Sequence, residues 1–159
     1  MRSEASIIID RPIGEVFAYA TNPECWPEWI SGVVKVVSDS GSRLDVGSTF
    51  GQVDTFPGHS RSEAWECIEY EPPWVLTCRR ITGSRPYTLR FVCVSVDGRT
   101  KLTICSDAGP GDLPGSGPEI ERAMAGRWKQ DLATLKGILE RRNDAVADAR
   151  RVTKAHDAD

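Results

Sequence analysis

The sequence predicts an α+β protein in which a strongly curved antiparallel sheet wraps around one long helix. Three observations carry this prediction. Residues 119–142 repeat apolar side chains at helical spacing within one sector about 140° wide. Residues 33–107 show strand patterns separated by turn signals. One strand and a helical pair come first, so the broad face of the long helix and one face of the sheet can cover each other.

The first thirty residues predict a strand followed by two short helical segments. Residues 3–10 contain a β-branched isoleucine run and read as the strand. Pro12 suits the first turn of a helix, whose apolar face repeats until the Asn22-Pro23 pair stops it. Residues 24–30 carry Trp26 and Trp29 and predict a short helix or turn. Both tryptophans need cover from the rest of the protein.

The middle of the chain predicts an antiparallel meander. We expect strands at residues 33–38, 61–69, 74–81, 87–96 and 100–107, and a strand pair or one bent strand at residues 43–56. The Pro72-Pro73 pair ends one strand, and Asp97-Gly98 is a strong hairpin signal. A bent sheet and a straight helix diverge along their length, so this arrangement tends to leave a cavity.

The long helix has a well-defined start. Ser116 and Glu119 have the spacing of a capping box, and Pro118 lies in the first turn. We expect the helix to end near Arg142. The sequence therefore predicts one domain over residues 1–142, followed by a polar, disordered tail over residues 143–159. The predicted buried face of the helix consists of Ile120, Met124, Ala125, Trp128, Leu132, Leu135, Ile138 and Leu139.

Composition excludes several classes of protein. The chain has 159 residues, of which 40% are hydrophobic and 27% charged, and this suits a single globular domain. A net charge of -3 gives no basic excess, which argues against a nucleic-acid partner. No apolar run is long enough for a signal peptide or a membrane span, so we expect a cytoplasmic protein without stable membrane insertion. With two histidines and no C-x-x-C motif among five cysteines, we expect reduced core thiols, no metal site and no cofactor.

Three stretches of the sequence resemble a known superfamily. The opening IIIDRPIGEVFAYATNPECWPEW resembles the start of START-like, or SRPBCC, proteins. The stretch WECIEYEPPWVLTCRR resembles two consecutive strands of their meander, and TLRFVCVSVDGRTKLTI resembles the following hairpin. The spacing is most similar to the branch of polyketide cyclase/dehydrase and lipid transport proteins. This resemblance implies a helix-grip fold with an apolar cavity between the sheet and the C-terminal helix. The matching positions are turn and packing residues, so no catalytic role transfers with them.

Aromatic and soft side chains supply the candidate ligand-binding residues. As a set they are suited to an apolar pocket that holds one lipid, sterol or polycyclic ring system. Each of them taken alone suits core packing equally well. The set consists of Trp26, Trp29, Phe50, Trp65, Tyr87, Phe91, Met124 and Trp128.

The candidate catalytic residues are Arg80, Tyr87 and His59. If Arg80 faces the inside of the sheet, it needs a carboxylate or an anionic ligand group, and Glu63 and Asp131 are candidate carboxylates. Tyr87 offers a hydroxyl that could polarise a ligand carbonyl. His59 lies in a Pro-Gly-His turn that could overhang the cavity mouth and act as a general base. The alternative for Arg80 and His59 is a solvent-exposed position without a role.

Three functions remain open from the sequence. The first is a carrier or binder of a small hydrophobic molecule in the cavity. The second is a polyketide cyclase, aromatase or dehydratase that uses the same cavity. The third is a ligand-free interaction or regulatory module, for which a partner surface or a homodimer would be the place to look.

Overall fold

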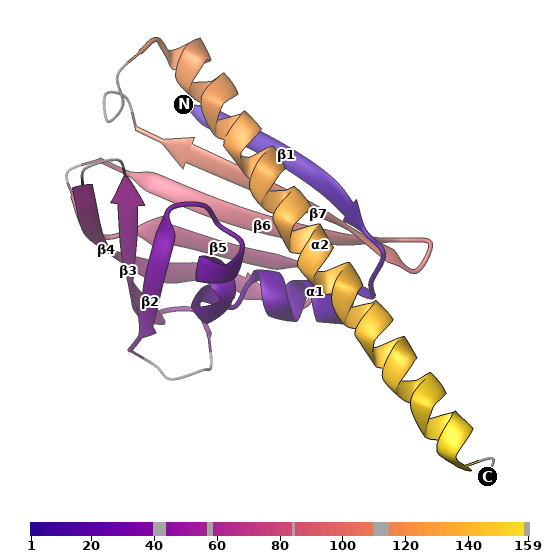
Figure 1. The fold of residues 1–159 in the computed structure, drawn as a ribbon. Helices are drawn as coiled ribbons and strands as arrows, with labels where there is room; N and C mark the ends of the chain where they lie inside the picture. The colour runs from indigo at the N-terminus through magenta and orange to yellow at the C-terminus, as the bar shows by residue number, and fades with distance from the viewer. Residues whose placement is uncertain (40–43, 57–58, 84, 110–114, 158–159) are drawn as a thin grey trace.

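A computed structural model describes residues 1–39, 44–56, 59–83, 85–109 and 115–157, with side chains outside this description at 56, 59 and 143–157. The described chain forms one sheet with its helices on the inner face (Figure 1). The elements in order are β1 (Arg2–Ile9), α1 (Ile13–Ala20), the 3-10 helix η1 (Pro23–Glu28), β2 (Val33–Ser38), β3 (Thr49–Phe56), β4 (His59–Glu71), β5 (Val75–Arg80), β6 (Tyr87–Val96), β7 (Arg99–Ala108) and α2 (Gly117–Asp157).

The sheet has seven strands in the order β1-β7-β6-β5-β4-β3-β2, and every neighbouring pair is antiparallel. Strands β2 to β7 thus follow one another as a meander, and β1 joins the far edge beside β7. Asp97 and Gly98 connect β6 to β7 with φ angles of 51° and 79°, as a tight hairpin turn of the type I′ class requires. The predicted fold class and meander are confirmed.

The pleat of the strands decides which side chains point inward. In β6, Leu89, Phe91 and Cys93 are buried at every second position. In β4 the register shifts between Cys67 and Glu69, and this bulge changes the alternation along the strand. The inner face of β6 is therefore apolar at these positions, and in β4 the spacing of inward side chains changes at the bulge.

The start of α2 follows the predicted capping box. The backbone N–H of Ser116 donates to Glu119 Oε2 at 3.1 Å, and the backbone N–H of Glu119 donates to Ser116 Oγ at 3.4 Å. The buried face of the helix then contributes Trp128, Leu132 and Leu135 to the core. The capping hydrogen bonds thus stabilise the start of the helix, and apolar packing holds the rest of its buried face against the sheet.

Helix α2 lies along β1 (Figure 1). The hydroxyl of Ser3 donates to the backbone carbonyl of Glu121 at 3.0 Å. Further along, Lys136 Nζ donates to the backbone carbonyl of Ile8 at 2.7 Å. The helix and the strand run in the same direction, so the first and last elements of the fold are fastened together.

The helix is longer than the sequence analysis expects. It continues through residues 143–157 and projects beyond the sheet, instead of ending near Arg142 before a disordered tail (Figure 1). The segment 143–157 contains neither glycine nor proline and is rich in alanine, so nothing in it stops a helix. The boundary of the domain at residue 142 stays a prediction. Among the described residues, no helix combines the length and the apolar character needed to cross a membrane.

Candidate functional site

A cavity of about 150 Å³ lies between α2, η1 and the inner face of strands β2 to β7. Its apolar lining consists of Trp26, Ile30, Val33, Trp65, Leu89, Ala108, Met124 and Trp128. Its polar lining consists of Gln52, Asp54, Arg61, Glu63, Arg80, Tyr87 and Arg127. A void of about this volume holds one aromatic ring, so a larger ligand must extend through the opening.

The polar lining arises because inward positions near the ends of β3 and β4 carry polar residues. In β3 the buried positions are Phe50, Gln52 and Asp54, two residues apart. In β4 the lining positions Arg61 and Glu63 precede Trp65 at the same spacing. The inner face of the sheet thus changes from apolar to polar toward one end of these two strands.

Arg80 faces inward and forms an ion pair with Glu63. The distance from Arg80 Nη1 to Glu63 Oε1 is 3.1 Å, and each side chain is 8% exposed. Arg80 Nη2 also donates to the backbone carbonyl of Arg85 at 2.9 Å. Of the two carboxylates considered from the sequence, Glu63 is the partner. The guanidinium is therefore fixed by protein groups at both terminal nitrogens.

Tyr87 lines the cavity beside this ion pair. Its ring contacts Trp65 edge-on at 5.5 Å between centroids, and the Arg80 guanidinium lies 5.6 Å from the ring centre. Burial raises the pKa of Tyr87, while the Ser106 hydroxyl and nearby arginines oppose that rise. Ser106 also accepts a hydrogen bond from Trp128 Nε1 at 3.1 Å. Tyr87 is therefore a neutral phenol at physiological pH, able to donate a hydrogen bond.

Asp54 is a buried carboxyl in the polar lining. Gln52 Nε2 donates to Asp54 Oδ1 at 2.7 Å. Burial raises the pKa of Asp54, and the hydrogen bond from Gln52 and the charges of Arg127 and Arg61 oppose this effect. Burial prevails, so the cavity environment favours the neutral acid more than water does.

Arg127 and Asp131 fasten α2 to the turn before β2. Arg127 Nη2 donates to the backbone carbonyl of Ser31, and Arg127 Nε donates to Ser31 Oγ at 3.1 Å. Ser31 Oγ in turn donates to Asp131 Oδ2 at 3.2 Å. Burial raises the pKa of Asp131, partly offset by its hydrogen bonds with Ser31 and by Arg127. Asp131 thus belongs to this contact and is not the partner of Arg80.

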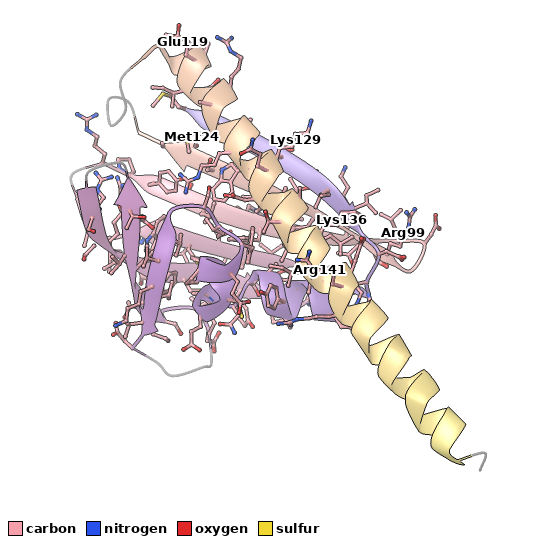
Figure 2. The ribbon with its side chains drawn as sticks, in the orientation of Figure 1. Arg99, Glu119, Met124, Lys129, Lys136 and Arg141 are labelled. Carbon is pink, nitrogen blue, oxygen red and sulfur yellow. The ribbon has the colours of Figure 1, made fainter. Side chains whose placement is uncertain are left out.

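Several of the predicted ligand-binding residues line the cavity, namely Trp26, Trp65, Tyr87, Met124 and Trp128. They come from η1, β4, β6 and α2. In Figure 2, Met124 and Lys129 lie on opposite sides of α2, with Met124 toward β3 and β4. Whether these residues contact a ligand stays a prediction.

The remaining predicted residues, Trp29, Phe50 and Phe91, are not among the lining residues of this cavity, and their role in ligand binding also stays a prediction. All three are buried in the core. The ring of Trp26 stacks on Phe91 at 5.6 Å and meets Phe50 edge-on at 5.4 Å between centroids. Trp26 thus lines the cavity and also packs against both of these core rings.

His59 begins β4, but its side chain lies outside the described part of the structure. The sequence analysis missed Gln52, Asp54, Arg61 and Arg127 as lining residues. The signal for the first two was available, because period-two alternation from Phe50 places both on the same inner face. Among the residues with described side chains, no group of three or more histidine, cysteine, aspartate or glutamate residues is placed to hold a metal ion.

Solved structures similar to this chain share its fold. The di-domain ARO/CYC StfQ from the steffimycin biosynthetic pathway aligns with a TM-score of 0.72 and 17% identity, over 90% of this chain and 51% of that one. The di-domain ARO/CYC BexL from the BE-7585A biosynthetic pathway gives 0.69 and 19%, over 88% and 46%. This chain spans about half the length of these two di-domain proteins. Protein MLL2253 from Mesorhizobium loti gives 0.68 and 16%, over 89% and 98%.

These likenesses show the helix-grip fold. Comparison with curated protein sequences gives no match. A family model described as polyketide cyclase / dehydrase and lipid transport matches residues 1–140, which include every lining residue of the cavity. The chain therefore belongs to the polyketide cyclase/dehydrase and lipid transport family.

Proposed function

We propose that this protein binds a small hydrophobic molecule in the cavity between its sheet and α2. The observation that supports this is the cavity itself, with apolar side chains from both sheet and helix around a space of about 150 Å³. Membership of a family of cyclases, dehydrases and lipid transport proteins agrees with such a ligand.

The size of the cavity limits what the apolar contact can contribute. A single ring buries roughly 150 Å² of apolar surface, which stabilises the complex by about 4 kcal/mol before the costs of association. Such a contact alone gives weak binding. A ligand of useful affinity must add polar contacts or a group that extends through the mouth.

Native mass spectrometry of the purified protein, followed by organic extraction, tests the proposal. We expect a bound molecule that has an apolar ring or chain end. The variant Ala108→Leu adds bulk to a lining residue and should abolish this binding. The same substitution at Ala123, which is exposed on α2, is the matched control and should leave binding intact. Equal binding by both variants would place the ligand elsewhere.

A cyclase is the second candidate, favoured by the position of Tyr87. A buried neutral phenol that lines the cavity can donate a hydrogen bond to a ligand carbonyl and stabilise the negative charge that develops there. Arg80 is less suited to this role than the sequence suggests, since Glu63 and the Arg85 carbonyl engage both of its terminal nitrogens. Tyr87→Phe should then abolish turnover of a polyketide-like substrate and leave its Kd nearly unchanged. Full turnover by this variant would remove Tyr87 from the chemistry.

A further inference from the structure

The mouth of the cavity is marked by two arginines. Arg61 on β4 and Arg127 on α2 are the exposed members of its lining, with side chains 52% and 42% exposed. Every other lining residue in the described chain is buried or half-buried. A ligand that enters the cavity passes these two guanidinium groups, one from the sheet and one from the helix.

The carboxylate of Glu63 is shared between two of the arginines that line the cavity. Glu63 accepts from Arg80 at 3.1 Å, and the same oxygen lies 3.5 Å from Arg61 Nε. Since Arg80 holds this carboxylate more closely and in a more buried place, Arg61 has only a secondary share of it. Arg61 makes no other ion pair within the described residues.

Arg127 is also incompletely neutralised. Its Nε lies 3.9 Å from Asp131 Oδ2, a carboxylate that accepts a shorter hydrogen bond from Ser31. Asp54 lies near enough to Arg61 and Arg127 for both charges to oppose the rise that burial causes in the pKa of its carboxyl. The two exposed residues of the lining are therefore both cationic, whereas most of the other lining residues are apolar.

We propose that the ligand is a small hydrophobic carboxylic acid, whose ring or chain end fills the cavity and whose carboxylate lies at the mouth between Arg61 and Arg127. This inference rests on the proposed function and names its ligand class. A guanidinium pairs with a carboxylate through two parallel N–H···O bonds, which fixes the orientation of the acid. The cavity holds a single ring and leaves the polar end outside it. A cationic ligand would face two like charges at the same place.

Two matched ligands test the inference, 3-phenylpropionate and its neutral amide. They share the ring and the chain and differ in the anionic group. Tryptophan fluorescence reports their binding, because Trp26, Trp65 and Trp128 line the cavity. In 20 mM buffer we expect the acid to bind about tenfold more tightly than the amide, and we expect 0.5 M salt to remove most of this difference by screening.

Variants of Arg61 show whether its charge, and not only the shape of the cavity, determines the preference for the acid over the amide. Arg61→Gln should bring the ratio of the two affinities close to one, and Arg61→Lys should preserve most of it. The control is Arg79→Gln, which removes the same charge from an arginine that is 55% exposed and paired with Glu66 on the outer face of the sheet. This control should keep the ratio of the unaltered protein. Circular dichroism checks that each variant folds.

The outcomes distinguish the two proposals. Equal binding of acid and amide, or a ratio that Arg61→Gln leaves unchanged, overturns the carboxylate inference and leaves hydrophobic binding in place. Failure of both ligands to bind the unaltered protein overturns the inference and counts against a ring-sized hydrophobic ligand as well.

Discussion

Glu63 and Arg80 form an ion pair on the inner face of β4 and β5, and Glu66 and Arg79 form another on the outer face of the same two strands. The inner pair has a distance of 3.1 Å, and both side chains are 8% exposed. The outer pair is closer, at 2.7 Å, but its side chains are 27% and 55% exposed. The protein thus contains a buried pair and a more solvated pair on opposite faces of the same two strands.

Removal of one partner should affect these pairs very differently. We expect Glu63→Ala to lower the free energy of unfolding by about 3 kcal/mol, because it leaves a buried guanidinium without its carboxylate. Glu66→Ala should cost less than about 1 kcal/mol. Urea denaturation measures both values. Similar losses for the two variants would show that burial does not govern the inner pair.

The hydrogen bond between Trp128 and Ser106 holds the first half of α2 to β7. Ser106→Ala leaves the buried indole N–H of Trp128 without its acceptor, and this should cost about 1–3 kcal/mol of stability. Ser95→Ala, on an exposed part of β6, is the control and should be nearly neutral. Urea denaturation followed by circular dichroism makes the comparison, and an equally neutral Ser106→Ala would contradict this account of the helix contact.

The buried carboxyl of Asp54 should make stability depend on pH. Burial raises its pKa in the folded protein above the value of about 3.9 in the unfolded chain. Between these two pKa values the folded state holds a proton that the unfolded state has released, so this residue's contribution to stability falls as pH rises through the window.

Asp54→Asn keeps an acceptor for Gln52 and cannot ionise. We expect its Tm to exceed that of the unaltered protein at pH 7, with the difference vanishing below about pH 4. Asp10→Asn, at an exposed position after β1, is the control and should lack this pattern. A Tm difference for Asp54→Asn that stays constant across the pH range would argue against burial as its cause.

Substitutions in the core and in the cavity lining should affect different quantities, the first mainly stability and the second mainly ligand affinity. Phe91→Leu removes part of a fully buried ring and should lower stability by about 1–3 kcal/mol, while the Kd for 3-phenylpropionamide stays within about twofold. Ala108→Leu should abolish binding with a smaller loss of stability. Calorimetry measures both quantities. A large loss of affinity in Phe91→Leu would return this ring to the ligand site.

The fold could be predicted because its signals are local and agree with one another. The capping box at Ser116 and Glu119, the hairpin at Asp97-Gly98 and the alternation in β6 each specify one element with little help from distant residues. Together they leave few arrangements other than a meander around a helix. Helix α2 extends past Arg142 because the polar sequence that follows contains no helix breaker, a point that polarity alone does not reveal.

The candidate site could be predicted only in part, because it depends on how far each side chain reaches. Trp26 and Phe50 are both candidate pocket aromatics in the sequence, but only the packed structure shows that their rings meet edge-on and that Trp26 alone of the two lines the cavity. Polar residues such as Asp54 are usually exposed, but the pleat of β3 places this one on the inner face. Strand register, which the sequence leaves open, decided the inward position of Arg80.

The position of β1 has a consequence for the order of folding. Within the described sheet β1 pairs with β7, and its residue Ile9 lies opposite Thr100. A ribosome releases the chain from its N-terminus, so the isoleucines of β1 emerge long before β7, the strand with which β1 pairs, has been synthesised. The meander from β2 to β7 can form progressively from neighbouring segments. The pairing of β1 with β7 and the packing of α2 must wait until β7 and α2 have left the exit tunnel of the ribosome.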